Sequence, residues 1–205
     1  MASYSCKYLP LFGSCLSWRK EDWTNSDDTV RGGTSYSKLL VSSEYNSVTF
    51  AGKLDCKLLG AAFASQRTTS TTQKWDLCEY DGIKITLRAG DGKMYTLNIK
   101  TDIPPHTPDG RDQSSLQYSF DFIADDSKEE QVIYALFERF IPSYRGRKQE
   151  GAPPLNRANI RRWSIMIRSF FGKQEGDFCL VLDNLSAFEK RKSNQDRPCG
   201  LCLLQ

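Results

Sequence analysis

Short runs with β-strand character follow one another along most of this chain, and they restrict its fold more than any other feature. In the run at 82–88, apolar Ile83, Ile85 and Leu87 alternate with polar residues, which is the pattern of a half-buried strand. Further runs lie at 38–41, 47–54, 63–69, 93–99, 115–122, 132–137, 163–168 and 178–183. About nine strands without a long helical pattern predict an all-β fold, an antiparallel β-sandwich or jelly roll.

The segments between these runs predict how the strands are connected. Ala89–Gly92 joins two neighbouring runs and has the composition of a tight hairpin turn. Two long loops with several prolines lie at 102–112 and 142–155, and loops of this length on a compact sandwich are often functional. A short helical turn is expected at 155–160.

A chain of 205 residues fits one domain with a substantial core. We expect residues 1–17 to form an N-terminal segment partly packed on the domain, and residues 18–189 to form the sandwich. Residues 190–205 change in composition and predict a flexible basic tail.

Composition argues against several classes of protein. A net charge of +3 is too small to indicate a nucleic-acid partner, and no run of about 18 apolar residues predicts a transmembrane helix. The N-terminus has the pattern of neither a secretory signal nor a mitochondrial transit peptide. The seven cysteines are irregularly spaced and His106 is the single histidine, so we expect reduced intracellular thiols, no metal site and no cofactor.

Residues 23–37 combine an aromatic side chain, two carboxylates, an arginine and a Gly-Gly pair that allows a tight fold. Asp27, Asp28 and Arg31 are close enough in sequence to pair with each other or to meet a common partner. Three interpretations are open. The loop is held by a structural ion pair and Asx-type hydrogen bonds, or it recognises a ligand or partner at the rim of the sandwich, or it binds calcium.

A second candidate site is a small-ligand pocket, because aromatic side chains with a few convergent polar groups are what such a pocket needs. The residues that would line it are Trp23, Gln66, Arg67, Trp75 and Tyr144. The alternative is that the polar pair faces solvent and the aromatic residues are core, as we expect for Trp163.

The basic run Arg145–Lys148 either holds a phosphate or carboxylate or forms a solvated turn. Enzyme signatures are mostly absent, since the chain has neither a P-loop nor a Gly-x-Ser-x-Gly elbow. His106 could act as a general base, but no neighbour in the sequence is recognisable as its orienting partner. A binding protein is therefore favoured over an enzyme.

Motifs in a fixed order resemble those of the complex I intermediate-associated protein family. They are WTNSDDTVRGGTSYS at 23–37, GAAFASQR at 60–67, LCEYDGI at 77–83, GDGKMYTL at 90–97, FIPSYRGR at 140–147, and IRRWSIMI at 160–167 followed by GDFCL at 176–180. The resemblance covers roughly residues 18–190.

The resemblance implies a galactose-binding-like β-sandwich. It also implies a non-catalytic assembly factor, or chaperone-like binder, for respiratory complex I, with an assembly intermediate as its protein partner and a mitochondrial location. The alternative belongs to another class: a cytoplasmic or peripheral membrane protein that binds a small molecule. Its ligand would be a carbohydrate, or an apolar metabolite that a pocket positions for cofactor-free cyclisation.

The last four residues, Cys202-Leu203-Leu204-Gln205, fit the prenylation box, and the basic run at 190–192 would add attraction to an anionic membrane face. The alternative is an unmodified apolar terminus.

Prenylation of Cys202 predicts that the mass of the native protein differs from that of the unmodified, unproteolysed chain, because a prenyl group is added and the residues after Cys202 can be removed. It also predicts that Cys202→Ser, carrying an N-terminal tag, leaves the membrane fraction, because one of the two membrane signals is lost. Intact mass spectrometry and cell fractionation check both outcomes. A native mass equal to that of the intact, unmodified chain excludes the modification.

Overall fold

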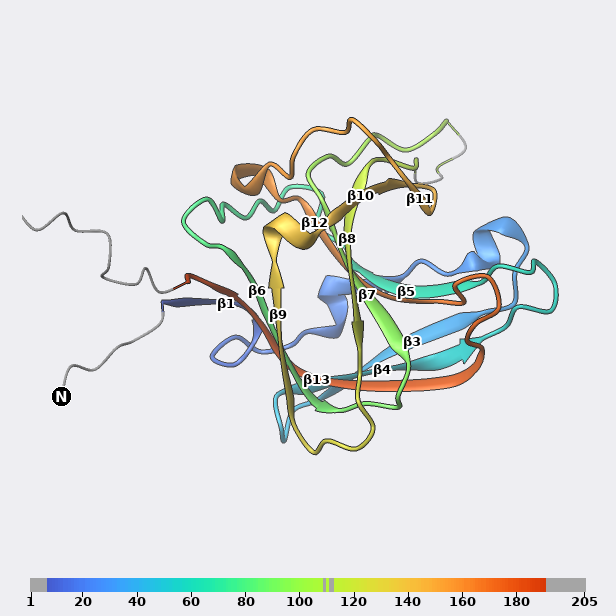
Figure 1. The fold of residues 1–205 in the computed structure, drawn as a ribbon, viewed down its shortest axis with the longest axis horizontal. Helices are drawn as coiled ribbons and strands as arrows, with labels where there is room; N and C mark the ends of the chain where they lie inside the picture. Colours follow the sequence, from blue (N-terminus) through green and yellow to red (C-terminus); the bar gives the residue numbers. More distant parts are fainter. Residues whose placement is uncertain (1–6, 109, 111–112, 191–205) are drawn as a thin grey trace, which may run out of the picture.

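The computed structural model describes residues 7–108, 110 and 113–190, which form a sandwich of two antiparallel sheets (Figure 1). The six-stranded sheet contains β1 (Tyr8–Gly13), β3 (Tyr36–Ser42), β4 (Ser47–Leu54), β6 (Gly82–Ala89), β9 (Gln131–Leu136) and β13 (Gly176–Phe188). The seven-stranded sheet contains β2 (Trp23–Asn25), β5 (Phe63–Thr68), β7 (Met94–Lys100), β8 (Gln117–Ile123), β10 (Ile141–Tyr144), β11 (Arg147–Lys148) and β12 (Arg162–Arg168). The predicted all-β antiparallel sandwich is confirmed.

Short 3₁₀ turns complete the described chain: η1 (Lys20–Asp22), η2 (Asp28–Arg31), η3 (Phe137–Arg139) and η4 (Arg157–Asn159). The last of these confirms the helical turn expected at 155–160. In the described part of the chain, no helix has the length and apolar character of a membrane span. Apart from Lys190, the predicted basic tail, with Cys202, lies outside the described residues.

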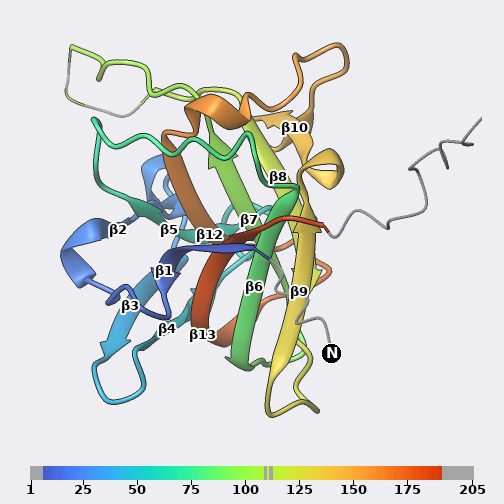
Figure 2. The same ribbon diagram turned by 90° about the vertical axis from the view of Figure 1, so that its left-hand side faces the viewer.

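Strand β13 organises the six-stranded sheet because it is long enough to pair with three other strands. Residues 176–182 pair with β4, and residues 184–188 pair with β1 on the same side. Residues 181–188 pair with β6 on the other side, so the order is β3-β4-β13-β6-β9 with β1 beside the end of β13 (Figure 2). Residues 8–13 of the predicted N-terminal segment therefore join the sandwich as a strand.

The nine predicted strands all have counterparts, and the structure adds β1, β2, β10 and β11. These four are short or irregular. Strands β2 and β11 form the two edges of the seven-stranded sheet, and the register of β1 shifts between Pro10 and Phe12. Proline has no N–H to donate to a ladder, and two- or three-residue strands carry little periodicity, so pattern alone does not reveal them.

The hairpin predicted at Ala89–Gly92 is wrong, because β6 and β7 belong to different sheets. The turn packs against Ala124 after the end of β8. Gly92 donates its N–H to the Ala124 carbonyl at 2.7 Å, and a Cβ on Gly90 would lie 2.5 Å from the Ala124 carbonyl carbon. The glycines therefore let the chain pass from one sheet to the other in close contact with Ala124, and they do not form a two-residue hairpin.

The carboxylate of Asp91 fixes this crossing to both sheets. It accepts hydrogen bonds from the Tyr95 hydroxyl of β7 and from the backbone N–H of Cys179 in β13, each at 2.9 Å. Tyr95 is fully buried between the sheets. Burial, together with the negative charge of Asp91, raises the pKa of Tyr95 well above its usual range.

The raised pKa of Tyr95 predicts that the free energy of unfolding falls at alkaline pH. Because the pKa of Tyr95 is higher in the folded than in the unfolded chain, its contribution is complete below about pH 10 and is lost as the pH rises further, by about 1.4 kcal/mol per pH unit. We expect the free energy of unfolding of the wild type to fall more steeply above about pH 10 than that of Tyr95→Phe. Urea denaturation over that range measures both slopes, and equal slopes would contradict the assignment.

Candidate binding face

Asp27 is buried where the chain passes from β2 to β3, and its carboxylate ties the two sheets together. It accepts hydrogen bonds from the backbone N–H and the hydroxyl of Ser37, at 3.0 and 2.7 Å, and from the backbone N–H of Ser65 at 2.8 Å. Ser37 belongs to β3 of the six-stranded sheet, whereas Ser65 belongs to β5 of the seven-stranded sheet. One carboxylate thus fixes the separation of the sheets at this end.

Asp28 makes a second connection of the same kind. It is fully buried and accepts hydrogen bonds from the backbone N–H groups of Ser35 and Phe63, at 3.0 and 3.2 Å. A Cβ on Gly33 would lie 2.2 Å from its Oδ1 atom, which explains why glycine follows in the sequence. Arg31 is exposed, and its guanidinium lies 4.7 Å from the centroid of the Phe63 ring.

These contacts support the structural interpretation of the loop at 26–35, which we call the aspartate loop. No ion pair joins Arg31 to Asp27 or Asp28 in the described chain, so hydrogen bonds to the two carboxylates hold this loop. The carboxylate oxygens already accept hydrogen bonds from N–H and O–H donors. Among the described residues, no group of three or more His, Cys, Asp or Glu side chains could hold a metal ion.

The tryptophans expected to line a pocket pack into the core instead. Trp23 is 6% exposed and Trp75 is partly buried. Both contact Phe12, with ring centroids 5.1 and 6.0 Å away, and Trp75 also meets Trp163 at 6.1 Å. Trp163 is fully buried, which confirms its predicted core position.

The other predicted pocket residues lie apart from one another. Gln66 points between the sheets and donates from Nε2 to the Ser37 hydroxyl at 2.9 Å, whereas Arg67 lies on the opposite face of β5. Tyr144 is on β10, five strand spacings from Trp23 on β2, or about 24 Å. Two depressions of about 310 and 290 Å³ lie elsewhere, beside η3 and beside η1. The five residues therefore do not share one pocket.

The basic run Arg145–Lys148 forms the tip of the hairpin between β10 and β11. Arg145 and Gly146 have φ values of +50° and +76°, which suit a two-residue turn. The Arg145 guanidinium lies 5.4 Å from the centroid of the Tyr144 ring. Both side chains are exposed at this edge of the sheet.

The outer face of the seven-stranded sheet carries mostly polar side chains. Tyr95, Leu97 and Ile99 of β7 point into the core, so the residues between them point outward. One row of register partners crosses six strands: Thr24, Arg67, Ser164, Asn98, Ser119 and Ile141. A neighbouring row contains Ser65, Met166, Thr96 and Asp121, and a third contains Arg162 and Lys100. We call this surface the polar face.

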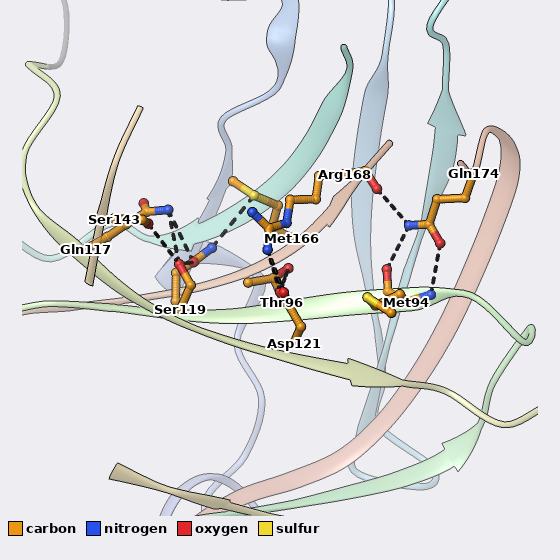
Figure 3. A network of polar contacts seen from close by, with 10 residues as sticks. Met94, Thr96, Gln117, Ser119, Asp121, Ser143, Met166, Arg168 and Gln174 are labelled. Carbon is orange, nitrogen blue, oxygen red and sulfur yellow. Dashed lines mark hydrogen bonds and ion pairs between the residues drawn. The ribbon is translucent and has the colours of Figure 1, made fainter. Parts of the chain in front are cut away.

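Side chains at the centre of the polar face bind one another (Figure 3). Asn98 accepts hydrogen bonds at Oδ1 from Ser119 Oγ at 2.7 Å and from Gln117 Nε2 at 3.3 Å. The hydroxyls of Ser119 and Ser143 lie 3.2 Å apart. These contacts link β7, β8 and β10 and hold the polar groups in fixed positions.

A charged pair continues the network toward β12. Arg168 Nη2 donates to both carboxylate oxygens of Asp121, at 2.6 and 2.8 Å, and Thr96 donates to the same carboxylate at 2.7 Å. The Nε–H of Arg168 is buried without an acceptor among the described residues.

Asn98 carries a donor that has only a weak acceptor. Its Nδ2 atom donates to the sulfur of Met166 at 3.8 Å, and a thioether is a weak acceptor. Met166 is partly exposed and has a flexible side chain that can move aside. The polar face therefore combines preorganised acceptors with an Asn98 donor that an oxygen would satisfy better than the Met166 sulfur does.

Of the predicted site residues, only Arg67 lies on the polar face. The central residues were missed because outward polar positions on half-buried strands are ordinary. Their burial is the unusual property: Thr96 and Asn98 are 1% and 2% exposed although they point away from the core. Sequence alternation at 93–99 and 115–122 indicated which residues point outward, but not that they touch one another.

The family of the chain follows from comparison with known sequences. Residues 16–182 match the model of the family described as complex I intermediate-associated protein 30 (CIA30). The chain belongs to the CIA30 family. A protein of Schizosaccharomyces pombe, named "Uncharacterized protein C9E9.15", is 42% identical over 186 residues, which cover 89% of this chain and 84% of the relative.

Solved structures share the fold at low identity. The family 11 carbohydrate-binding module of a Clostridium thermocellum cellulase, Lic26A-Cel5E, superposes with a TM-score of 0.59 at 14% identity, covering 95% of this chain and all of the module. An agarase, AgWH50C, gives a TM-score of 0.56 at 16% identity, covering 90% of this chain and 25% of the agarase. These likenesses support the β-sandwich of a CIA30 domain.

The aspartate loop yields a stability prediction. Asp27→Ala would leave the N–H groups of Ser37 and Ser65 buried without their acceptor, so we expect a loss of about 3 kcal/mol or more in the free energy of unfolding. Asp177→Ala, at an exposed position of β13, is the matched control and should change it by less than about 0.5 kcal/mol.

Urea denaturation measures both variants, and calcium titration of the wild type separates the remaining interpretations. We expect no calcium-dependent change in Tm. Wild-type stability of Asp27→Ala, or a rise in Tm with calcium, would contradict a purely structural role.

Proposed function

We propose that this CIA30 domain is a non-catalytic binding protein that assists assembly of respiratory complex I. It would hold an extended polypeptide segment of an assembly intermediate on the polar face. The observation that carries the proposal is the row of polar side chains on five neighbouring strands of one sheet, from Thr24 to Ser119, in which hydrogen bonds hold Asn98 and Ser119 in place. Family membership supports the choice of complex I, and with it a mitochondrial location.

The chemistry of the polar face suits a polypeptide. Amide and hydroxyl groups at its centre match peptide N–H and C=O groups, which need a partner once they leave water. Arg67 in the first row and Lys100 in the third are partly exposed cations, and they favour a segment that carries carboxylates. The outward positions of β7, β8 and β12 contain no aromatic residue, so the face lacks flat rings for stacking.

Carbohydrate is the second candidate ligand. A family 11 module with this fold was solved with a β-1,3-1,4-mixed-linked tetrasaccharide, and it has a TM-score of 0.58 with this chain. Asn98, Gln117 and Asp121 are also groups that sugar hydroxyls bind. The absence of outward aromatic residues on the central strands makes the polypeptide the stronger candidate.

The test places a charge in the middle of the polar face. Ser164 is partly exposed at the centre of the first row, and Ser164→Glu should repel an acidic segment and reduce copurification of complex I subunits by about 10-fold or more. Ser42→Glu, partly exposed on β3 of the other sheet, is the matched control and should retain them.

Quantitative mass spectrometry of tagged protein from mitochondria measures the subunits, and unchanged Tm values show that both variants fold. Equal recovery from both variants would contradict the proposal. Titration with the mixed-linked tetrasaccharide provides the second arm. Binding that Ser164→Glu abolishes would favour carbohydrate instead.

A further inference from the structure

Three loops meet at one end of the sandwich, on the right of Figure 1. Each of them exposes a large apolar side chain. We call this region the loop end; it contains residues 28–35, 55–62 and 169–175. Phe171 is 90% exposed, Val30 76% and Leu58 64%, the largest values among the exposed apolar residues of the described chain. Each loop supplies one of the three.

Hydrogen bonds hold the three loops against one another. The backbone N–H of Asp55 donates to Ser35 Oγ at 3.0 Å, which joins the first loop to the second. The N–H of Ala62 donates to Ser169 Oγ at 3.0 Å, and the N–H of Ser169 donates back to the Ala62 carbonyl at 2.9 Å. The three loops that carry the exposed side chains are therefore joined to one another by hydrogen bonds.

The third loop carries backbone strain in order to present Phe171. Phe170 and Phe171 have φ values of +46° and +61°, a conformation that costs on the order of 1 kcal/mol or more for each non-glycine residue. Gln174 anchors the loop by donating from Nε2 to the carbonyls of Met94 and Arg168, at 2.8 and 2.7 Å (Figure 3). Arg168 also covers the ring of Phe170, at 4.4 Å from its centroid, whereas the ring of Phe171 is left in solvent.

A cation accompanies each apolar tip. Arg31 follows Val30, Lys57 precedes Leu58, and Lys173 lies two residues after Phe171; all three cations are exposed. Glu175 is the exposed carboxylate of these loops. The carboxylate of Asp55 accepts the N–H of Lys57 at 3.0 Å, and this bond lowers the pKa of Asp55. The exposed charge of the loop end is positive.

We propose that the loop end docks on an anionic membrane surface, with Phe171, Val30 and Leu58 inserted at the boundary between headgroups and acyl chains. Side chains on separate loops do not form the continuous surface that a protein interface requires, but lipid adapts to each of them. The adjacent cations meet the lipid phosphates. This surface leaves the polar face free for a partner.

Vesicle sedimentation of the full, unmodified chain tests the proposal, with phosphatidylcholine vesicles compared against phosphatidylcholine–phosphatidylserine vesicles. Binding should require phosphatidylserine and should weaken with salt. Phe171→Ser should reduce the partition coefficient by about 10-fold or more, because an inserted phenylalanine is lost. Leu40→Ser, at a 55% exposed position of β3, is the matched control and should bind as the wild type does.

A second variant follows insertion directly and does not depend on the loss of binding. Phe171→Trp should show a blue shift of its tryptophan emission with anionic vesicles only. Failure of the wild type to bind these vesicles would overturn the proposal. So would equal binding by Phe171→Ser, which would assign attachment to the basic tail. A dimer in analytical ultracentrifugation that Phe171→Ser dissociates would also overturn it, since a second copy would then be the occupant.

Discussion

The buried carboxylates of Asp27 and Asp28 are the interaction on which the rest of this structure depends. Each takes backbone N–H groups from strands or loops of both sheets, so the spacing and register of the sheets are fixed at this end. Burying charge is costly unless the charge is fully hydrogen-bonded. The hydrogen-bond donors for the two carboxylates come from Ser35 and Ser37, just after Gly33, and from Phe63 and Ser65 at the start of β5. Because most of these groups are close in sequence, they form one compact motif.

Both proposed surfaces follow from this connection. Strand β5 carries Arg67 on the polar face, and its position is set by the bonds from Ser65 and Phe63 to the two aspartates. The loop end extends from the same region, because the first of its loops contains Asp28 and the second leads into β5. A change in the aspartate loop should therefore disturb stability and both surfaces together, whereas changes on one surface should leave the other intact.

The strand pattern predicted the fold well, because period-two alternation directly reports a half-buried sheet. It failed where a contact between distant segments decides the outcome. The turn at Gly90 looks like a hairpin, but its lack of a Cβ serves the close approach to Ala124. Trp23 and Trp75 looked like pocket residues, yet aromatic side chains fill cores for the same physical reason that they line pockets. Asn98 and Ser119 gave no signal, since their contact depends on the pairing of β7 with β8.

The central claim is that the polar face of the seven-stranded sheet contacts the partner. A photo-crosslinking amino acid placed at position 164, on the polar face, and in parallel at position 38, on the outer face of the other sheet, tests it directly. In intact mitochondria, our account predicts adducts with complex I subunits from position 164 and none from position 38. Adducts from position 38 alone, or none from position 164, would contradict it.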